Sequence, residues 1–146
     1  MEIERKFLIK EMPKNLDCFP CRDLEQGYLC TAPVVRIRKD NDKYELTYKS
    51  KGLMVREEYN LPLTQSSYEH LKSKIDGNLI TKKRYMIPFE SYTIELDIFQ
   101  GKLSPLVLAE VEFSSQEEAL SFVPPSWFGE DVTLSKMYHN SALSKV

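Results

Sequence analysis

Alternation of residue type is the feature of this chain that most constrains its fold. Eight stretches place apolar side chains at every second position, and most of them carry charged side chains at the positions between. These stretches are Met1–Ile9, Cys21–Cys30, Val34–Lys39, Lys43–Ser50, Met54–Leu61, Leu79–Pro88, Tyr92–Phe99 and Leu106–Phe113. Helical spacing or capping residues predict three short helices, at Thr64–Lys72, Ser114–Phe122 and Ser135–Leu143. The pattern predicts an α+β, mainly β protein whose antiparallel strands have one apolar and one charged face.

The charges are sorted by sign from strand to strand. In five strands two residues of like sign stand two positions apart, and therefore on the same face. The pairs are Glu2/Glu4, Arg36/Arg38, Lys82/Arg84, Glu95/Asp97 and Glu110/Glu112. Like-sign neighbours destabilise a sheet, so a solvent-facing sheet has no reason to adopt this order. The order is explained if the charged faces turn inward around a water-filled lumen, since an eight-stranded barrel can hold one small ligand.

Two interpretations of the charged faces follow. In the first, the protein is a β-rich domain with one solvated charged face and no ligand. In the second, basic pairs bind an extended polyanion and acidic pairs hold hard divalent cations, which prefer carboxylate oxygen. Adding Lys6, Lys49, Arg56 and Glu58 gives seven basic and seven acidic residues on these faces. A phosphate chain complexed with Mg²⁺ or Mn²⁺ satisfies both signs, which favours the second interpretation.

An inward charged face leaves the apolar strand faces pointing outward. They need cover from the helices near Tyr68 and Ala119 or from another subunit, which makes a homodimer a reasonable expectation.

Length and composition narrow the class of protein. With 146 residues, the chain is expected to form one domain, 1–146. A net charge of −2 and a pI near 5.8 argue against a protein that coats nucleic acid or an anionic membrane. No apolar run approaches the ~20 residues of a membrane span, and the acidic Glu2 is unlike a signal peptide. We therefore expect a cytoplasmic protein with neither nucleic acid nor membrane as a partner.

The three cysteines are Cys18, Cys21 and Cys30. Their odd number argues against a disulfide framework. The first two have the C-x-x-C spacing of a metal half-site or a redox pair. Because no second C-x-x-C exists and both histidines lie far along the chain, a chance spacing of structural cysteines is favoured.

The ordered set of charged residues resembles the CYTH superfamily, also called triphosphate tunnel metalloenzymes. The matching motifs, which extend over essentially the whole chain, are Glu2-x-Glu4-x-Lys6, Gln26-Gly27-Tyr28-Leu29, Arg36-x-Arg38, Lys49, Arg56-x-Glu58, Lys82-x-Arg84-Tyr85, Glu95-x-Asp97, Glu110-x-Glu112 and Tyr138-x-Asn140. The resemblance implies an eight-stranded antiparallel tunnel barrel with a few short flanking helices, which binds a triphosphate with a divalent metal. Activities of the family include inorganic tripolyphosphatase, thiamine triphosphatase, RNA triphosphatase and class IV adenylate cyclase.

The resemblance also implies residue roles. The expected metal ligands are Glu2, Glu4, Glu58, Asp97, Glu110 and Glu112. The expected phosphate-binding residues are Lys6, Arg36, Arg38, Lys49, Arg56, Lys82 and Arg84, with Lys136 near the tunnel mouth. Those expected to act in catalysis are Lys6, Glu58, Asp97 and Glu112. Arginine suits bidentate phosphate contact, and lysine supplies a compact charge.

One departure concerns Asn60, where members of the family often carry a glutamate. Asparagine can accept a hydrogen bond but brings no negative charge, which puts a second metal site in doubt. The leading functional hypothesis is metal-dependent hydrolysis of a triphosphate, with inorganic tripolyphosphate favoured. The alternatives are cyclisation of ATP with release of pyrophosphate, and a non-catalytic module that binds polyphosphate or a nucleotide.

Four aromatic residues could contact the organic part of a substrate: Tyr28, Tyr85, Phe99 and Trp127. Packing on the outer layer or against helices is the favoured interpretation for them. The sequence therefore does not name the organic part of any substrate.

Overall fold

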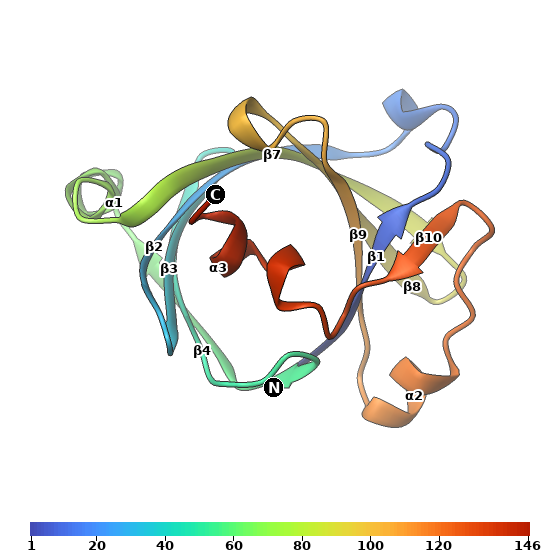
Figure 1. Cartoon of the computed structure of the whole chain (residues 1–146). Helices are drawn as coiled ribbons and strands as arrows, with labels where there is room; N and C mark the ends of the chain where they lie inside the picture. Colours follow the sequence, from blue (N-terminus) through green and yellow to red (C-terminus); the bar gives the residue numbers. More distant parts are fainter.

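The computed structural model describes residues 1–146, and its ten strands form one antiparallel sheet that curls into a barrel (Figure 1). The strands are β1 (Glu2–Ile9), β2 (Cys21–Thr31), β3 (Val34–Asp40), β4 (Lys43–Lys49), β5 (Val55–Arg56), β6 (Glu58–Leu63), β7 (Asp76–Phe89), β8 (Tyr92–Phe99), β9 (Val107–Glu112) and β10 (Phe128–Asp131). Their order is β10-β1-β9-β8-β7-β2-β3-β4-β6, and β5 pairs with β1.

The barrel closes through β5 and β6, which flank Glu57. Glu58 on β6 lies opposite Lys49 on β4, whereas Arg56 on β5 lies opposite Glu2 on β1. The single strand predicted at Met54–Leu61 is therefore divided, because the chain leaves one neighbour and joins the other at this corner. Taken together, β5 and β6 form one wall, and the barrel has the eight predicted walls. The sequence did not predict β10, which pairs with the end of β1 beyond β5.

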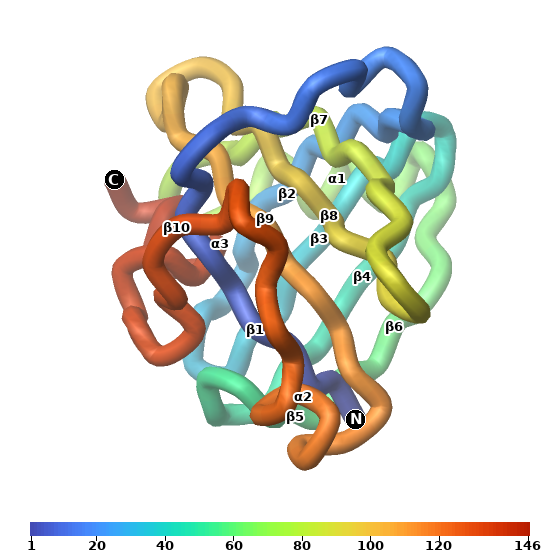
Figure 2. Tube along the Cα trace, turned by 90° about the vertical axis from the view of Figure 1, so that its right-hand side faces the viewer, coloured from blue at the N-terminus to red at the C-terminus, as the bar shows by residue number.

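The larger apolar core lies outside the barrel wall. On β1, Ile3 and Phe7 belong to this core, while Glu4 and Lys6 line the lumen. Helix α2 (Gln116–Ser121) covers this outer face, and the segment from α2 to β10 passes in front of β1 in Figure 2. The helix begins where predicted, because the Ser115 side chain accepts a hydrogen bond from the Glu118 N–H at 3.1 Å. The predicted outward-facing core is confirmed here.

Helix α1 (Gln65–Lys72) covers the outside of β3 and β4. Its N-cap is Thr64, as predicted, and the Thr64 side chain accepts a hydrogen bond from Ser67 N–H. Tyr68 is fully buried, its ring centroid lies 5.1 Å from that of Tyr44, and its hydroxyl donates to Glu25 Oε1 at 2.8 Å. This helix thus covers one side of the barrel, and α2 another.

The C-terminal segment differs from the prediction. The helix expected at Ser135–Leu143 is divided into a 3₁₀ turn, η3 (Lys136–Tyr138), and the short helix α3 (Asn140–Leu143). Both lie within the ring of strands instead of flanking it (Figure 1). The Val132 N–H binds the Lys6 carbonyl at 2.8 Å, and the Asn78 N–H binds the Ser144 carbonyl at 2.7 Å. These contacts with β1 and β7 hold the segment inside one end of the barrel.

A second core cluster closes that end of the barrel. Leu143 and Val132 pack there with five strand residues: Tyr28, Val34, Ile80, Phe99 and Leu108. The C-terminal segment comes so close to β7 at Ser144 that position 77 has to be glycine. At Gly77 φ is 80°, and a Cβ would lie 2.5 Å from the Ser144 carbonyl oxygen. β7 begins at Asp76, three residues earlier than predicted, because Asp76 still pairs with Tyr28 of β2.

Four further features complete the fold. Register shifts interrupt the pairing of β2 at and after Gly27, which indicates a bulge, and a Cβ at Gly27 would lie 2.7 Å from the side-chain atom Ile75 Cγ2. The 3₁₀ turns η1 (Leu16–Cys18) and η2 (Gly101–Leu103) lie in connections. Cys18, Cys21 and Cys30 are free and exposed. The helices are all too short and too polar to cross a bilayer.

Candidate functional site

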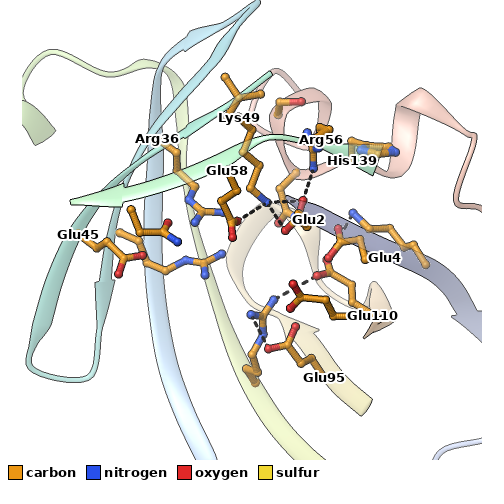
Figure 3. Close-up of a pocket in the computed structure, with 18 of the residues that line it drawn as sticks. Glu2, Glu4, Arg36, Glu45, Lys49, Arg56, Glu58, Glu95, Glu110 and His139 are labelled. Atoms are coloured by element: carbon orange, nitrogen blue, oxygen red, sulfur yellow. Dashed lines mark hydrogen bonds and ion pairs between the residues drawn. The ribbon is translucent and has the colours of Figure 1, made fainter. Parts of the chain in front are cut away.

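A polar cavity of about 270 Å³ occupies the lumen of the barrel (Figure 3). Seven basic side chains line it: Lys6, Arg22, Arg36, Arg38, Lys49, Arg56 and Arg84. Eight acidic side chains line it as well: Glu2, Glu4, Asp40, Glu45, Glu58, Glu95, Glu110 and Glu112. The two signs nearly balance, so the chemistry of the cavity depends on which charges are neutralised by a neighbour and which are free.

Two free carboxylates lie side by side on one wall. Glu4 on β1 and Glu112 on β9 are directly opposite each other across the pairing of these strands, and neither has a basic partner within 4 Å. Glu4 is only 8% exposed. Burial, with Glu110 and Glu2 nearby, raises the pKa of Glu4 to about 8. Burial and neighbouring carboxylates also raise the pKa of Glu112.

The other acidic residues of this wall are neutralised. Lys6 Nζ lies 3.4 Å from one Glu110 oxygen, and an Arg84 guanidinium nitrogen lies 3.5 Å from the other. Burial alone would raise the pKa of Glu110, but the charges of Lys6 and Arg84 hold it well below its usual range. Glu2 is paired with Lys49 at 2.9 Å and with Arg56 at 3.4 Å. Each of these basic residues therefore already has a carboxylate in the absence of ligand.

Two arginines have no carboxylate partner. Arg36 and Arg38 on β3 form no ion pair, although Arg36 Nη2 donates to Thr47 Oγ1 at 3.1 Å and Arg38 donates twice to the Gln26 side-chain oxygen. The Nε of Arg36 is buried without a partner. Burial, with Arg36 and Arg84 nearby, lowers the pKa of Arg38 to about 9. These are the guanidinium groups most in need of an anion.

The free arginines and the free carboxylates lie on facing walls. In the ring of eight walls, β3 and β9 are separated by β8, β7 and β2 on one side and by β4, β5/β6 and β1 on the other. Figure 3 accordingly shows Arg36 across the cavity from Glu4 and Glu110. A ligand that spans the lumen can therefore present an anion to β3 and a cation to β1 and β9.

Asp97 and Lys82 do not line the cavity, contrary to the prediction. Both are fully buried, and Lys82 Nζ lies 2.7 Å from one Asp97 oxygen. Arg84 donates to both Asp97 oxygens, at 2.7 and 2.9 Å. With both oxygens occupied, Asp97 is not available as a metal ligand in this arrangement. It instead orients Arg84, which does reach the cavity.

Lys136 also lies outside the tunnel cavity. It is exposed and lines a neighbouring hollow of about 540 Å³, which shares Arg56 and His139 with the tunnel. Its predicted place near a mouth of the tunnel is consistent with this position. Every other predicted site residue lines the tunnel cavity.

Asn60 lies on β6 beside the predicted ligand Glu58. Its side-chain oxygen accepts a hydrogen bond from Thr47 Oγ1 at 2.6 Å, and Thr47 in turn accepts one from Arg36. Glu58 lies 3.4 Å from Lys49. Asn60 therefore belongs to the hydrogen-bonded surroundings of a free arginine and adds no carboxylate to this wall.

The residues present suit a hard divalent cation, although no three acidic, histidine or cysteine side chains converge closely enough to hold one in this arrangement. The donor set consists of carboxylate oxygens, which such cations prefer. Glu4 and Glu112 have no basic partner within 4 Å, and because they lie opposite each other on paired strands they repel when both are ionised. A cation between them would remove that repulsion, whereas Glu2 and Glu110 would first have to release their basic partners to become further donors.

Several lining residues were missed by the sequence analysis: Arg22, Asp40, Glu45, His139, Asn140 and Ser141. Alternation could have found Glu45, which shares a strand face with Lys49, and Arg22, which shares one with Gln26. The motif Tyr138-x-Asn140 pointed to Asn140 without assigning it to the site. No local signal marks His139 or Ser141, because their place depends on how the C-terminal segment enters the barrel.

Of the four aromatic residues, only Tyr28 lines the cavity, and it also packs in the second core cluster. Tyr85 and Trp127 pack against the outer core. Phe99 is buried, with its ring centroid 5.1 Å from Lys82 Nζ. The favoured packing interpretation is confirmed for the last three.

Comparison with known proteins gives consistent matches over the whole chain. A CYTH domain family model matches residues 1–146. An inorganic triphosphatase of Nitrosomonas europaea is 42% identical, with 98% of this chain and 96% of the relative covered. An inorganic triphosphatase of Acetivibrio thermocellus is 36% identical, with 99% and 93% covered.

Solved structures agree with these matches. A crystal structure described as that of an inorganic triphosphatase has a TM-score of 0.74 and 39% identity, covering 100% of this chain and 95% of that one. A putative adenylyl cyclase from Hippeastrum, described as having a dominant triphosphatase activity, has a TM-score of 0.64 over 82% of this chain and 83% of that one. At 16% identity, the second likeness shows the fold alone.

Proposed function

Because the chain belongs to the CYTH domain family, we propose that its tunnel hydrolyses a triphosphate, with inorganic tripolyphosphate as the substrate. Two relatives similar over nearly their whole length are inorganic triphosphatases, which supports this choice. The family implies a divalent metal, and we propose that Mg²⁺ or Mn²⁺ fills this role.

One observation of the site carries the proposal. The arginines without carboxylate partners, Arg36 and Arg38, face Glu4 and Glu112, which are two of the three lining carboxylates without a basic partner. The third, Glu45, lies on β4 opposite Arg38 but forms no ion pair with it. A phosphate chain satisfies the arginines, and a cation bound to that chain satisfies the carboxylates. A simple anion would leave the acidic wall uncompensated.

The proposed mechanism needs no covalent nucleophile from the protein. Arg36 and Arg38 bind phosphate oxygens and hold the triphosphate across the lumen. Lys6 and Arg84, which contact Glu110, can each also contact a phosphate oxygen, so that their positive charges are shared between the carboxylate and the phosphate. A divalent metal supplies charge neutralisation and lowers the pKa of bound water. Glu4 must lose its proton before it can act as a ligand. Glu112 and Glu58, which line the cavity, are the residues to which we assign orientation of the attacking water.

Release of orthophosphate tests the proposal. We expect metal-dependent release from tripolyphosphate, well above that from pyrophosphate, ATP or thiamine triphosphate, with Mg²⁺ or Mn²⁺ and none with chelator. Formation of cyclic AMP and pyrophosphate from ATP would support the cyclase alternative instead. Tight metal-dependent binding without turnover of any of the four would support the non-catalytic binding module.

A further inference from the structure

The Asn140 side chain of the C-terminal segment contacts two strands at the end of the lumen. Its Oδ1 accepts a hydrogen bond from Gln26 Nε2 of β2 at 3.1 Å and one from Lys82 Nζ of β7 at 3.0 Å. Gln26 and Lys82 are both fully buried. Asn140 lies on α3, which the preceding contacts hold inside the barrel (Figure 1). The C-terminal segment thus provides the acceptor for two buried donors.

The bond to Asn140 fixes the orientation of the Gln26 amide. Because Gln26 Nε2 donates to Asn140, the other end of the amide, Oε1, must face the opposite way. There it accepts from Arg38 Nε at 2.9 Å and from Arg38 Nη2 at 2.6 Å. If the amide were turned over, its N–H groups would face the N–H groups of Arg38. Asn140 and Arg38 therefore hold the Gln26 amide in this orientation from its two ends, and Asn140 is the acceptor on the nitrogen side.

A neutral acceptor is significant at this position. Arg38 has no carboxylate partner, and its guanidinium lies near Arg36 and Arg84. The Gln26 oxygen orients the guanidinium without neutralising its charge, so the full positive charge stays available to an anion in the cavity. Arg38 lines that cavity, whereas Lys82 does not.

The same segment also contacts a third basic residue of the site. Lys6 Nζ donates to the Tyr138 carbonyl at 3.2 Å, and the Lys6 N–H donates to Thr133 Oγ1 at 2.9 Å. Basic residues of three strands thus depend, directly or through Gln26, on the stretch from Thr133 to Asn140.

We propose that Asn140 and Gln26 are positioning residues, which let the C-terminal segment set the orientation of Arg38 on the neighbouring strand β3. The hydrogen-bonded series runs from Asn140 through Gln26 to Arg38. The effect of this hydrogen-bonded series on phosphate binding rests on the proposed function, whereas the hydrogen bonds are present whatever the function is. Loss of the Asn140 acceptor frees the Gln26 amide to rotate, and Arg38 then loses its fixed direction.

The test compares Asn140→Ala and Gln26→Met with Asn78→Ala. Asn78 is the matched control, because its side chain donates to the Val146 carbonyl and ties the same segment to β7 without contacting the series. The first readout is solvent exchange of the Arg38 Nε–H by NMR without substrate, its signal assigned by its loss in Arg38→Lys. We expect exchange at least tenfold faster in Asn140→Ala and Gln26→Met, and unchanged in Asn78→Ala.

The second readout is the KM for tripolyphosphate. Loss of one oriented charge-assisted contact predicts a KM about tenfold higher in Asn140→Ala. In an Arg38→Ala background, Asn140→Ala should add nothing further, because its effect passes through Arg38. Multiplied effects in the double variant would show that Asn140 acts by another route and would overturn the proposal.

Unchanged Arg38 exchange in Asn140→Ala would also overturn it. If that variant does not fold, Asn140→Asp keeps the acceptor and should retain wild-type exchange, whereas fast exchange in a folded Asn140→Asp contradicts the series. A wild-type protein that does not hydrolyse tripolyphosphate would defeat the proposed function alone, since the exchange experiment needs no substrate.

Discussion

Glu4 is a buried carboxylate that no basic side chain neutralises, and its pKa of about 8 has a consequence for stability. Between pH 4.5 and 8 the native state holds a proton on Glu4 that the unfolded state has released. The unfolded state then binds fewer protons, so this group lowers the free energy of unfolding as the pH rises through that window. Metal binding opposes the effect, because the cation favours the ionised form.

Glu4→Gln removes this titration. With chelator present, we expect the variant to be more stable than the wild type by about 1 to 3 kcal/mol at pH 8, and the difference to vanish near pH 4. Urea unfolding at both pH values measures it. The same variant should lose metal-dependent phosphate release. Equal stability of the two proteins at pH 8 would mean that folding does not raise the pKa of Glu4.

Arg38 offers the matching prediction for the anion. Arg38→Ala removes a guanidinium that has no carboxylate partner, so the KM for tripolyphosphate should rise about tenfold or more. Arg22→Ala is the control, because Arg22 lines the same cavity but is already paired with Asp40 at 3.1 Å. Steady-state kinetics on both variants decides the point. A larger effect from Arg22 would remove Arg38 from the phosphate path.

At the scale of elements, the outer core allows stability to be changed separately from substrate binding. Phe122 follows α2, is 7% exposed, and lies with its ring centroid 5.2 Å from that of Phe113 and 5.5 Å from that of Tyr92. Because this cluster lies outside the wall, Phe122→Ala should cost about 3 kcal/mol of unfolding free energy without changing the KM for tripolyphosphate. Leu120→Ala, on the same helix but 74% exposed, should cost almost nothing.

Chemical unfolding and kinetics of these two variants test the location of the core. A large change in KM for a folded Phe122→Ala would show that the outer core and the tunnel are not separate.

Most of the walls could be predicted, because a period of two decides which side chains share a face regardless of the neighbouring strand. The corner at Glu57 could not, since it depends on which neighbours the two halves pair with. The place of η3 and α3 could not either. Helical spacing at Ser135–Leu143 says nothing about the side of the wall on which the segment lies.

The same limit applies to the site. The alternation along each strand correctly predicted that four residues face the lumen: Glu4, Glu112, Arg36 and Arg38. It could not show that Asp97 is fully occupied by Arg84 and Lys82, because that depends on side-chain contacts across β7 and β8. The free charges, which carry the functional argument, therefore became visible only in three dimensions.

In the whole molecule, the arrangement is a barrel with its polar groups inside and much of its apolar surface outside. α1 and α2 cover two sides, but Tyr59 and Leu61 on β6 remain more than half exposed. The homodimer and the cytoplasmic location stay predictions. What the fold provides is a lumen where free arginines on β3 face free carboxylates on β1 and β9.

The most direct test of that account is anomalous diffraction at the manganese edge from crystals grown with Mn²⁺ and a non-hydrolysable imido analogue of tripolyphosphate. The account predicts a manganese peak beside the Glu4 and Glu112 carboxylates, with phosphate oxygens within hydrogen-bond distance of Arg36 and Arg38. Manganese or phosphate bound only outside the lumen would contradict it.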